Sequence, residues 1–385
     1  MTHRKFSIPM VRRSPDEEGR TTTPLELFFD LVFVVAIAQA SSGLHHSIIS
    51  GHAADGILKY FMVFFAIWWA WINFTWFATT YDTDDVLHRL VVFVQLAGAL
   101  ILAAGIHSAF AEMDFTLATI GYAVMRFAIV SEWLRAARND PEHASRARRM
   151  ALGIAILQLM WIGRLFTLEA WGMQTFFILV FLELAVPAWI SSKTQLVFHA
   201  EHIAERYGLL TIIVLGESIL AASMSIQTFM AAGGSTIDLI PTLVGGFLIV
   251  VSLFWLYFEK DAAGILTSVR RAFIWGYGHY FIYAAGAAVG AGIAIEMDIV
   301  SGGLDLHGIH AGLSVSVPTA IFLVCVWWLR FDQRGSGING ILPLIIAVLV
   351  LVAPLGPAPV LVVGLLLAFQ VAVTSVRSHK IAIAN

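Results

Sequence analysis

The sequence predicts an all-α polytopic membrane protein, with about twelve transmembrane helices in two six-helix parallel repeats. Three observations predict it: the composition, a series of apolar segments of membrane-spanning length, and a polar pattern that occurs twice. Of the 385 residues, 59% are hydrophobic and only 13% are charged, and the mean hydropathy is +0.82. A soluble domain carries about 25% charged residues. The composition therefore excludes an ordinary soluble fold.

The apolar segments define the expected helices. A helix needs about 20 apolar residues to cross a hydrocarbon core about 30 Å thick. The first begins after Thr23, with Pro24 at an early position where its missing N–H does no harm. The last two are short and lie on either side of a turn around Pro354-Leu355-Gly356-Pro357, so a single tight hairpin is the alternative there. The twelve segments are 24–43, 57–79, 86–110, 115–137, 147–167, 171–190, 205–226, 240–259, 272–296, 311–330, 339–355 and 358–376.

The distribution of charges predicts the orientation. Basic residues concentrate in one set of loops, with Arg135, Arg138, Arg146, Arg148 and Arg149 in the connection between the fourth and fifth spans. The opposite loops contain mainly acids and histidines. By the positive-inside rule, both termini lie in the cytoplasm and the chain is a multi-pass protein of the bacterial inner membrane. Residues 1–23 and 377–385 are predicted cytoplasmic tails, and 193–204 a predicted interfacial connector.

The repeat is predicted from two similar stretches about 180 residues apart. Alignment of Glu26 with Glu205 sets Gln39 against Ser218 and Ala38 against Glu217. Six helices is an even number, so both halves, 24–192 and 205–376, would have the same orientation and be related by an axis along the membrane normal.

Several classes of function are disfavoured. The net charge of −3 gives no reason to expect a nucleic-acid partner. Cys325 has no partner for a disulfide. His199, His202 and Glu205 do not follow a metal-binding pattern such as H-E-x-x-H, so we expect neither a metal nor a cofactor. No nucleophile and base stand at a recognisable spacing, so we expect no enzymatic activity. The lipid bilayer is the expected environment.

The first candidate site lies at the predicted cytoplasmic end of the first half. Glu26 and Asp30 are spaced i and i+4, which places both on one helix face. Asp82, Asp84 and Arg89 fall at the same level in the connection between spans two and three. One interpretation is a vestibule that attracts cations or handles protons. The alternative is a salt-bridge network with Arg89 that holds three helices together. Asp30 lies one turn deeper and is the strongest candidate for an ion pathway.

An equivalent cluster is predicted in the second half, and it is more basic. Its members include Glu205, Arg206 and His279.

Further charged residues fall at membrane depth. They are Arg126, Glu132, Arg164, Glu183 and Glu217, of which Glu183 and Glu217 are predicted near the midplane. Charged residues inside a bilayer cost about 3 kcal/mol each on insertion scales and therefore normally face the protein interior. One interpretation is a protonatable or ion-binding centre. The other is pairing of the carboxylates with Arg126 or Arg164. Near the predicted outer face, His107, His310 and Glu296 are weaker candidates for sensing pH.

Specific motifs resemble a known family. The stretch from Pro24 to Val34 (PLELFFDLVFV), the turn Asp82-Thr83-Asp84, and Glu205-Arg206-Tyr207-Gly208-Leu209 with Leu215-Gly216-Glu217 resemble the low temperature requirement A (LtrA) family of bacterial membrane proteins. The resemblance covers about residues 20 to 376. It implies a link to growth in the cold, without a settled biochemical activity.

A more distant likeness concerns Phe28-Phe29-Asp30. It is similar to the Phe-Ser-Asp opening of the endolysosomal potassium/proton channel family and its bacterial relatives, which build a pore from two six-helix units. Phe29 stands where that family has serine, and Leu209 stands opposite Asp30 in the second half. Because those relatives also pair subunits, the likeness keeps a homodimer open.

The sequence therefore predicts a transporter or channel for a small cation or protons. Asp30, Glu183 and Glu217 would lie on the path, and Glu26, Asp82, Asp84 and Arg89 would shape its cytoplasmic end. The alternative is a non-transporting membrane regulator or scaffold linked to cold growth, whose charges are structural.

Overall fold

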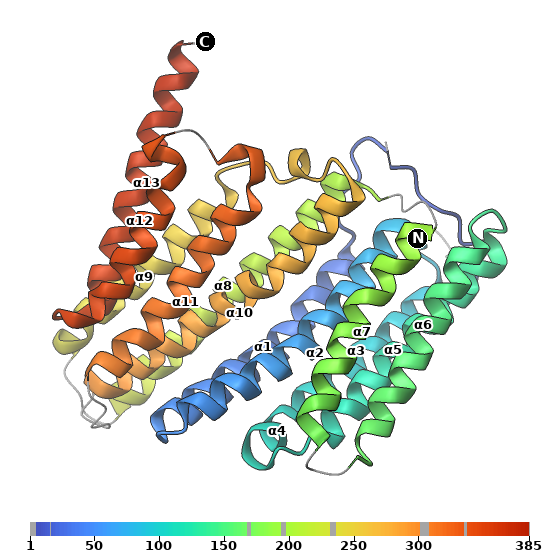
Figure 1. Cartoon of the computed structure of the whole chain (residues 1–385), viewed down its shortest axis with the longest axis horizontal. Coiled ribbons are helices and arrows are strands. Elements are labelled where there is room, and N and C mark those ends of the chain that lie inside the picture. The colour runs from blue at the N-terminus through green and yellow to red at the C-terminus, as the bar shows by residue number, and fades with distance from the viewer. Residues whose placement is uncertain are drawn as a thin grey trace. The chain divides into compact units, whose positions relative to one another are not determined.

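The structure is a computed structural model, and it describes residues 5–15, 17–167, 171–193, 198–231, 236–300, 308–334 and 337–384. Within these ranges the chain is all-helical, with no β-strand (Figure 1). The chain divides into two compact units. Unit 1 comprises residues 1–39 and 62–206, and unit 2 comprises residues 40–61 and 207–385.

Unit 1 contains α3 to α7 together with parts of three further helices. Within it, α3 packs against α5, α5 against α6, and α6 against α7. Helix α1 contributes its residues up to Gln39, α2 contributes its residues from Met62 onward, and α8 contributes its start up to Arg206. The bounds are α1 Pro24–Ile49, α2 Ala53–Thr80, α3 Val86–Ala104, α4 Ile106–Glu112, α5 Thr116–Asn139, α6 Ala144–Arg164, α7 Gly172–Lys193 and α8 Ala200–Ala231.

Glycines allow α3 and α5 to approach closely. A Cβ atom at Gly121 would lie 2.2 Å from the Leu102 nitrogen and 2.5 Å from the Gly98 oxygen. No side chain fits at that distance, so the two backbones are in direct contact. Small residues are used in this way where membrane helices pack tightly.

Unit 2 contains the rest of α8 with α9 to α13. In this unit α10 packs against α11, α9 against α13, and α11 against α12. The bounds are α9 Thr236–Phe258, α10 Val269–Val300, α11 Gly308–Leu329, α12 Ile338–Val352 and α13 Pro359–Ala384.

Each of the twelve predicted spans coincides with a helix, and α3 with α4 forms the third. Ten of them are long and apolar enough to cross a membrane in the part of the chain that is described. The two that do not qualify are α6 and α12. Helix α6 carries Arg146, Arg148, Arg149 and Arg164 within 21 residues, and α12 has only 15 residues. The all-helical fold and the membrane character are confirmed, whereas the two-repeat arrangement stays a prediction.

The two compact units do not follow the predicted repeat limits. The boundary near the middle of the chain falls between Arg206 and Tyr207, and residues 40–61 group with unit 2. Of the predicted connector 193–204, residues 194–197 lie outside the described ranges. Residues 200–204 are the start of α8.

The segment before α1 is bonded to helix ends rather than free. The Leu87 amide donates to the Phe6 carbonyl (3.0 Å), and the Arg13 amide donates to the Thr80 carbonyl (3.0 Å). Met10 is fully buried. The described residues before α1 therefore pack against one end of unit 1, because their backbone groups bond to those of α2 and α3.

Candidate functional site

The first site in unit 1 is built on the start of α1. Thr23 and Glu26 form a reciprocal cap: the Thr23 amide donates to Glu26 Oε2 (2.8 Å) and the Glu26 amide donates to Thr23 Oγ1 (3.3 Å). This capping box fixes where the helix begins and therefore how Glu26 is oriented. Asp30 follows one turn later on the same face.

Arg206 on α8 joins the two carboxylates. Its Nε donates to Asp30 Oδ2 (3.1 Å), its Nη2 donates to Asp30 Oδ1 (2.5 Å), and its Nη1 donates to Glu26 Oε1 (2.8 Å). Asp30 thus receives a bidentate, charge-assisted pair, the strong form of this interaction. Asp30 and Arg206 are each 0% exposed and Glu26 is 3% exposed, so the pair is removed from solvent.

Two further groups complete this cluster. The Trp71 indole N–H donates to Asp30 Oδ1 (2.7 Å). His202, one turn before Arg206, places Nε2 3.2 Å from Glu26 Oε1 and Nδ1 3.2 Å from Thr79 Oγ1. We call Glu26, Asp30, His202 and Arg206 the acid cluster.

The acid cluster has more carboxylates than permanent cations. Two carboxylates face one guanidinium, so the cluster is neutral only when one additional proton is bound, on His202 or on a carboxyl group. A net charge of −1 in a buried site would carry a large desolvation cost. The acid cluster therefore has a place for one additional proton by charge balance.

Asp82 and Arg20 lie at the same end of unit 1. Arg20 donates to the carbonyls of Ala78 (2.8 Å) and Thr79 (2.5 Å), which end α2. Burial raises the pKa of Asp82 above its ordinary value, and Glu26 raises it further, whereas Arg13 and Arg20 oppose the shift. A second carboxyl group, whose pKa is raised by burial, therefore lies in the electrostatic range of Glu26.

The predicted network with Arg89 is wrong. Arg89 Nε donates to Asp84 Oδ1 (2.7 Å), and these side chains are 37% and 50% exposed. Such a surface pair contributes about 0–1 kcal/mol. The buried partner of Glu26 and Asp30 is Arg206, which the predicted repeat places in the cluster of the second half.

The other members of the predicted basic cluster have partners of their own. Glu205 lies in unit 1 and accepts from the Thr22 amide (3.0 Å) in an exposed position. His279 belongs to unit 2, where it is buried; its Nε2 bonds to the Tyr257 hydroxyl (2.9 Å) and its Nδ1 to the Trp275 carbonyl (2.7 Å).

A second buried pair lies deeper in unit 1. Arg126 Nη2 donates to both oxygens of Glu183 (2.9 and 2.7 Å), and the indoles of Trp69 (2.7 Å) and Trp161 (3.1 Å) donate to the same carboxylate. Arg126 and Glu183 are each 1% exposed. Of the two predicted alternatives for Glu183, pairing with Arg126 is confirmed.

The remaining charges at membrane depth do not join that pair. Glu132 pairs with His88 (3.0 Å), and Arg164 lies at the end of α6 among aromatic rings. Glu217 belongs to unit 2, is buried, and accepts from Ser41 Oγ (3.4 Å), and it has no cationic partner among the described residues. Of the two carboxylates predicted near the midplane, Glu183 is therefore neutralised by an arginine and Glu217 is not, in the described part of the chain.

The weaker external candidates are dispersed. His107 is exposed, and Glu296 is buried in α10 with Oε1 lacking a partner among the described residues. His310 lines an apolar cavity of about 480 Å³ in unit 2.

Sequence reasoning missed the side chains that orient the carboxylates. The indole N–H groups of Trp69 and Trp71 each bond to a buried acid. A buried tryptophan usually needs an acceptor for its N–H, so an apolar helix rich in tryptophan could have suggested acidic partners. The spacing of His202 and Arg206, i and i+4, was a second signal, because it places two basic side chains on one helix face.

Comparison with known proteins agrees with this membrane architecture. Residues 21–376 match the model of the family described as "Bacterial low temperature requirement A protein (LtrA)". The chain is also similar to "Uncharacterized protein RA0937" of Rhizobium meliloti (strain 1021), with 29% identity over 289 residues, 69% of this chain and 68% of that protein. No solved structure matches it. Because the family model spans nearly all of the helical chain, this protein belongs to the bacterial low temperature requirement A (LtrA) family.

Proposed function

We propose that this membrane protein translocates protons or a small cation, and that the acid cluster is its protonatable centre in unit 1. One observation carries the proposal: Glu26 and Asp30 share a single guanidinium in a buried site, so charge balance requires one more proton. Ionisable residues within membrane segments commonly belong to proton relays or ion pathways. Asp82 supports the proposal, because a carboxyl group whose pKa is raised by burial lies close enough to interact with Glu26.

Ion flux into proteoliposomes tests this proposal. The full chain is reconstituted with a pH-sensitive dye inside the vesicles, and a potassium gradient with valinomycin drives proton entry. We expect faster acidification than in protein-free vesicles. Asp30→Asn keeps the shape of the side chain but removes its charge and its proton, and we expect it to slow the flux at least about tenfold, equivalent to about 1.4 kcal/mol in the barrier.

Two controls make the result interpretable. Asp114→Asn is the same chemical change at an exposed loop position, where the carboxylate only caps Thr116, and we expect no change in flux. His202→Gln tests the cluster without altering its bidentate pair. Equal flux in wild type, D30N and H202Q would remove the acid cluster from the mechanism. Absence of flux for H⁺, Na⁺ and K⁺ would remove transport altogether.

The second candidate is a non-transporting regulator or scaffold without enzymatic activity. The Arg126–Glu183 pair favours it, because this pair is enclosed and bonded to two indoles, as expected of a structural element. Absence of flux together with a normally folded chain would leave this candidate as the better one.

We also propose an inner-membrane location with both termini in the cytoplasm. The arginines at the end of α5 and the start of α6 support this orientation through the positive-inside rule. Protease accessibility of tags at the two ends in right-side-out and inverted vesicles tests it. Cross-linking in the membrane tests whether two copies associate.

A further inference from the structure

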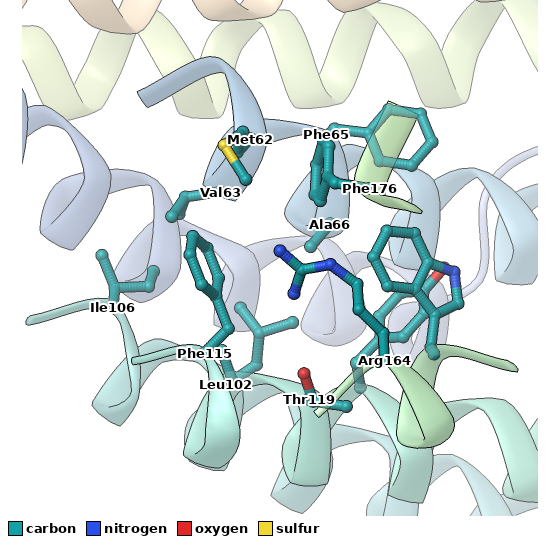
Figure 2. Close-up of a pocket in the computed structure, with 13 residues that line it drawn as sticks. Met62, Val63, Phe65, Ala66, Leu102, Ile106, Phe115, Thr119, Arg164 and Phe176 are labelled. Atoms are coloured by element: carbon teal, nitrogen blue, oxygen red, sulfur yellow. The ribbon is translucent and has the colours of Figure 1, made fainter. Parts of the chain in front are cut away.

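A small pocket in unit 1 contains an arginine that the charge pairs described above do not use. The cavity has a volume of about 40 Å³ and lies among α2, α3, α5, α6 and α7. Figure 2 shows its lining, in which Arg164 is the charged member. The apolar wall includes Met62, Val63, Leu102, Ile106, Phe115 and Phe176.

The Arg164 guanidinium lies inside this pocket. Its central carbon is 5.5 Å from the ring centroid of Phe115 and 5.5 Å from that of Phe176. Figure 2 shows the side chain reaching from α6 toward Ala66 on α2. Arginines near helix ends ordinarily extend toward the aqueous interface, so a side chain that points inward needs a partner there.

Among the described residues, a single backbone carbonyl accepts a hydrogen bond from Arg164. Arg164 Nε donates to the Gly172 carbonyl (3.2 Å), and within the described ranges no carboxylate pairs with Arg164. Glu183 is a buried carboxylate of the same unit, but it already accepts hydrogen bonds from Arg126, Trp69 and Trp161. A guanidinium carries five N–H donors in a fixed fork, which leaves the terminal nitrogens of Arg164 for an acceptor from outside the described chain.

Two exposed aromatic residues come shortly after Arg164 in the sequence. Phe166 is 85% exposed and Trp171 is 60% exposed. Aromatic side chains of this kind are enriched where a membrane protein meets the headgroup region. Their position next to Arg164 indicates that the pocket opens at headgroup depth, where phosphate and carboxylate groups of amphiphiles are concentrated.

The size of the cavity limits what enters it. One water needs about 10–15 Å³ of volume measured this way, so about 40 Å³ accommodates a compact group of a few heavy atoms. A carboxylate or phosphate fits this limit and matches the planar fork of arginine. An acyl chain does not fit inside and would lie over the apolar residues at the rim.

We propose that this pocket binds the anionic headgroup of a membrane amphiphile, whose carboxylate or phosphate oxygens accept hydrogen bonds from the terminal nitrogens of Arg164. The inference is independent of the transport proposal, because the pocket and the acid cluster use different residues.

Thermal stabilisation of the purified full chain in a zwitterionic detergent tests the site. The probes are phosphatidylglycerol, oleate, phosphatidylcholine, acetate and inorganic phosphate. We expect phosphatidylglycerol or oleate to raise the unfolding temperature in a saturable way, whereas acetate and phosphate do not. Arg164→Gln should weaken the effective amphiphile at least about tenfold, and Arg164→Lys should retain part of the affinity because it keeps the charge.

Two control variants separate a binding role from a structural one. Arg148→Gln removes an exposed arginine from the same helix and should bind like wild type. Glu169, which lies outside the described residues, is changed to Gln to test whether it supplies the missing partner within the chain.

The results decide the proposal in either direction. Loss of amphiphile binding in R164Q, with binding intact in R148Q and E169Q, supports it. Equal binding by wild type and R164Q overturns it, and so does an equal loss in R164Q and E169Q. Binding of acetate or phosphate as strong as that of the amphiphiles would show a site for soluble anions and overturn the assignment to a membrane amphiphile. If R164Q does not fold, R164K and E169Q still decide the question.

Discussion

Removal of Arg126 should destabilise unit 1 strongly, because it leaves the charge of Glu183 buried without a cation. The carboxylate would keep its hydrogen bonds from Trp69 and Trp161 but lose both bonds from Arg126. Breaking one side of a buried pair costs about 3–5 kcal/mol. Nε and Nη1 of Arg126 have no partner among the described residues, so the native pair already carries a desolvation cost. We therefore expect Arg126→Met to cost about 3 kcal/mol, the lower end of that range.

A double-mutant cycle isolates the pair. Glu183→Gln alone leaves a buried guanidinium unpaired, and we expect a loss of similar size. The variant R126M/E183Q contains neither charge, and replacement of a whole buried pair by neutral groups is often close to neutral. The sum of the single losses should therefore exceed the loss in the double variant by about 2–3 kcal/mol.

The assay is reversible unfolding in mixed micelles followed by tryptophan fluorescence, to which Trp69 and Trp161 contribute. Arg148→Gln, an exposed arginine on α6, is the matched control and should change the free energy of unfolding by less than about 0.5 kcal/mol. Additive single losses, or a loss below about 1 kcal/mol for R126M, would refute the argument that the buried pair is held by mutual neutralisation.

Further predictions concern packing and the start of α3. Gly121→Ala should cost about 1–3 kcal/mol or more, because its Cβ would meet the backbone of α3; Gly163→Ala, where nothing lies within 4 Å, is the control in the same unfolding assay. Asp85 caps α3 through the His88 amide (2.8 Å) and also accepts from Arg135, so Asp85→Ala should cost about 1–2 kcal/mol, and an unchanged free energy would contradict the capping role. Burial alone would raise the pKa of Asp85, but the hydrogen bonds from Arg135 and from backbone amides outweigh it, and the pKa lies below its ordinary value. Its stabilisation should therefore be complete above the unfolded-state pKa of about 3.9 and be lost as the pH falls through the lower folded-state pKa; Asp85→Asn should remove this part of the acid dependence of unfolding, and identical acid profiles would count against it.

The sequence by itself determined the helices and the membrane character of the chain. Apolar length and composition act within one segment, so each predicted span from α1 to α13 corresponds to helix in the structure. The spacing of Glu26 and Asp30 likewise placed both on one face, because helical periodicity is a local property.

Only the tertiary structure decided which charges meet. Asp30 binds Arg206, 176 residues later in the chain, and not Arg89, which is near Asp84 in sequence and pairs with it at the surface. Glu183 and Glu217 are equivalent by predicted depth, but Glu183 is neutralised by Arg126, whereas Glu217 has a serine hydroxyl as its partner among the described residues. Arg164, a predicted partner of the buried carboxylates, lies in an aromatic pocket at a helix end. Such pairings depend on the rotation and register of helices against one another, and these are fixed by packing contacts that no single segment encodes.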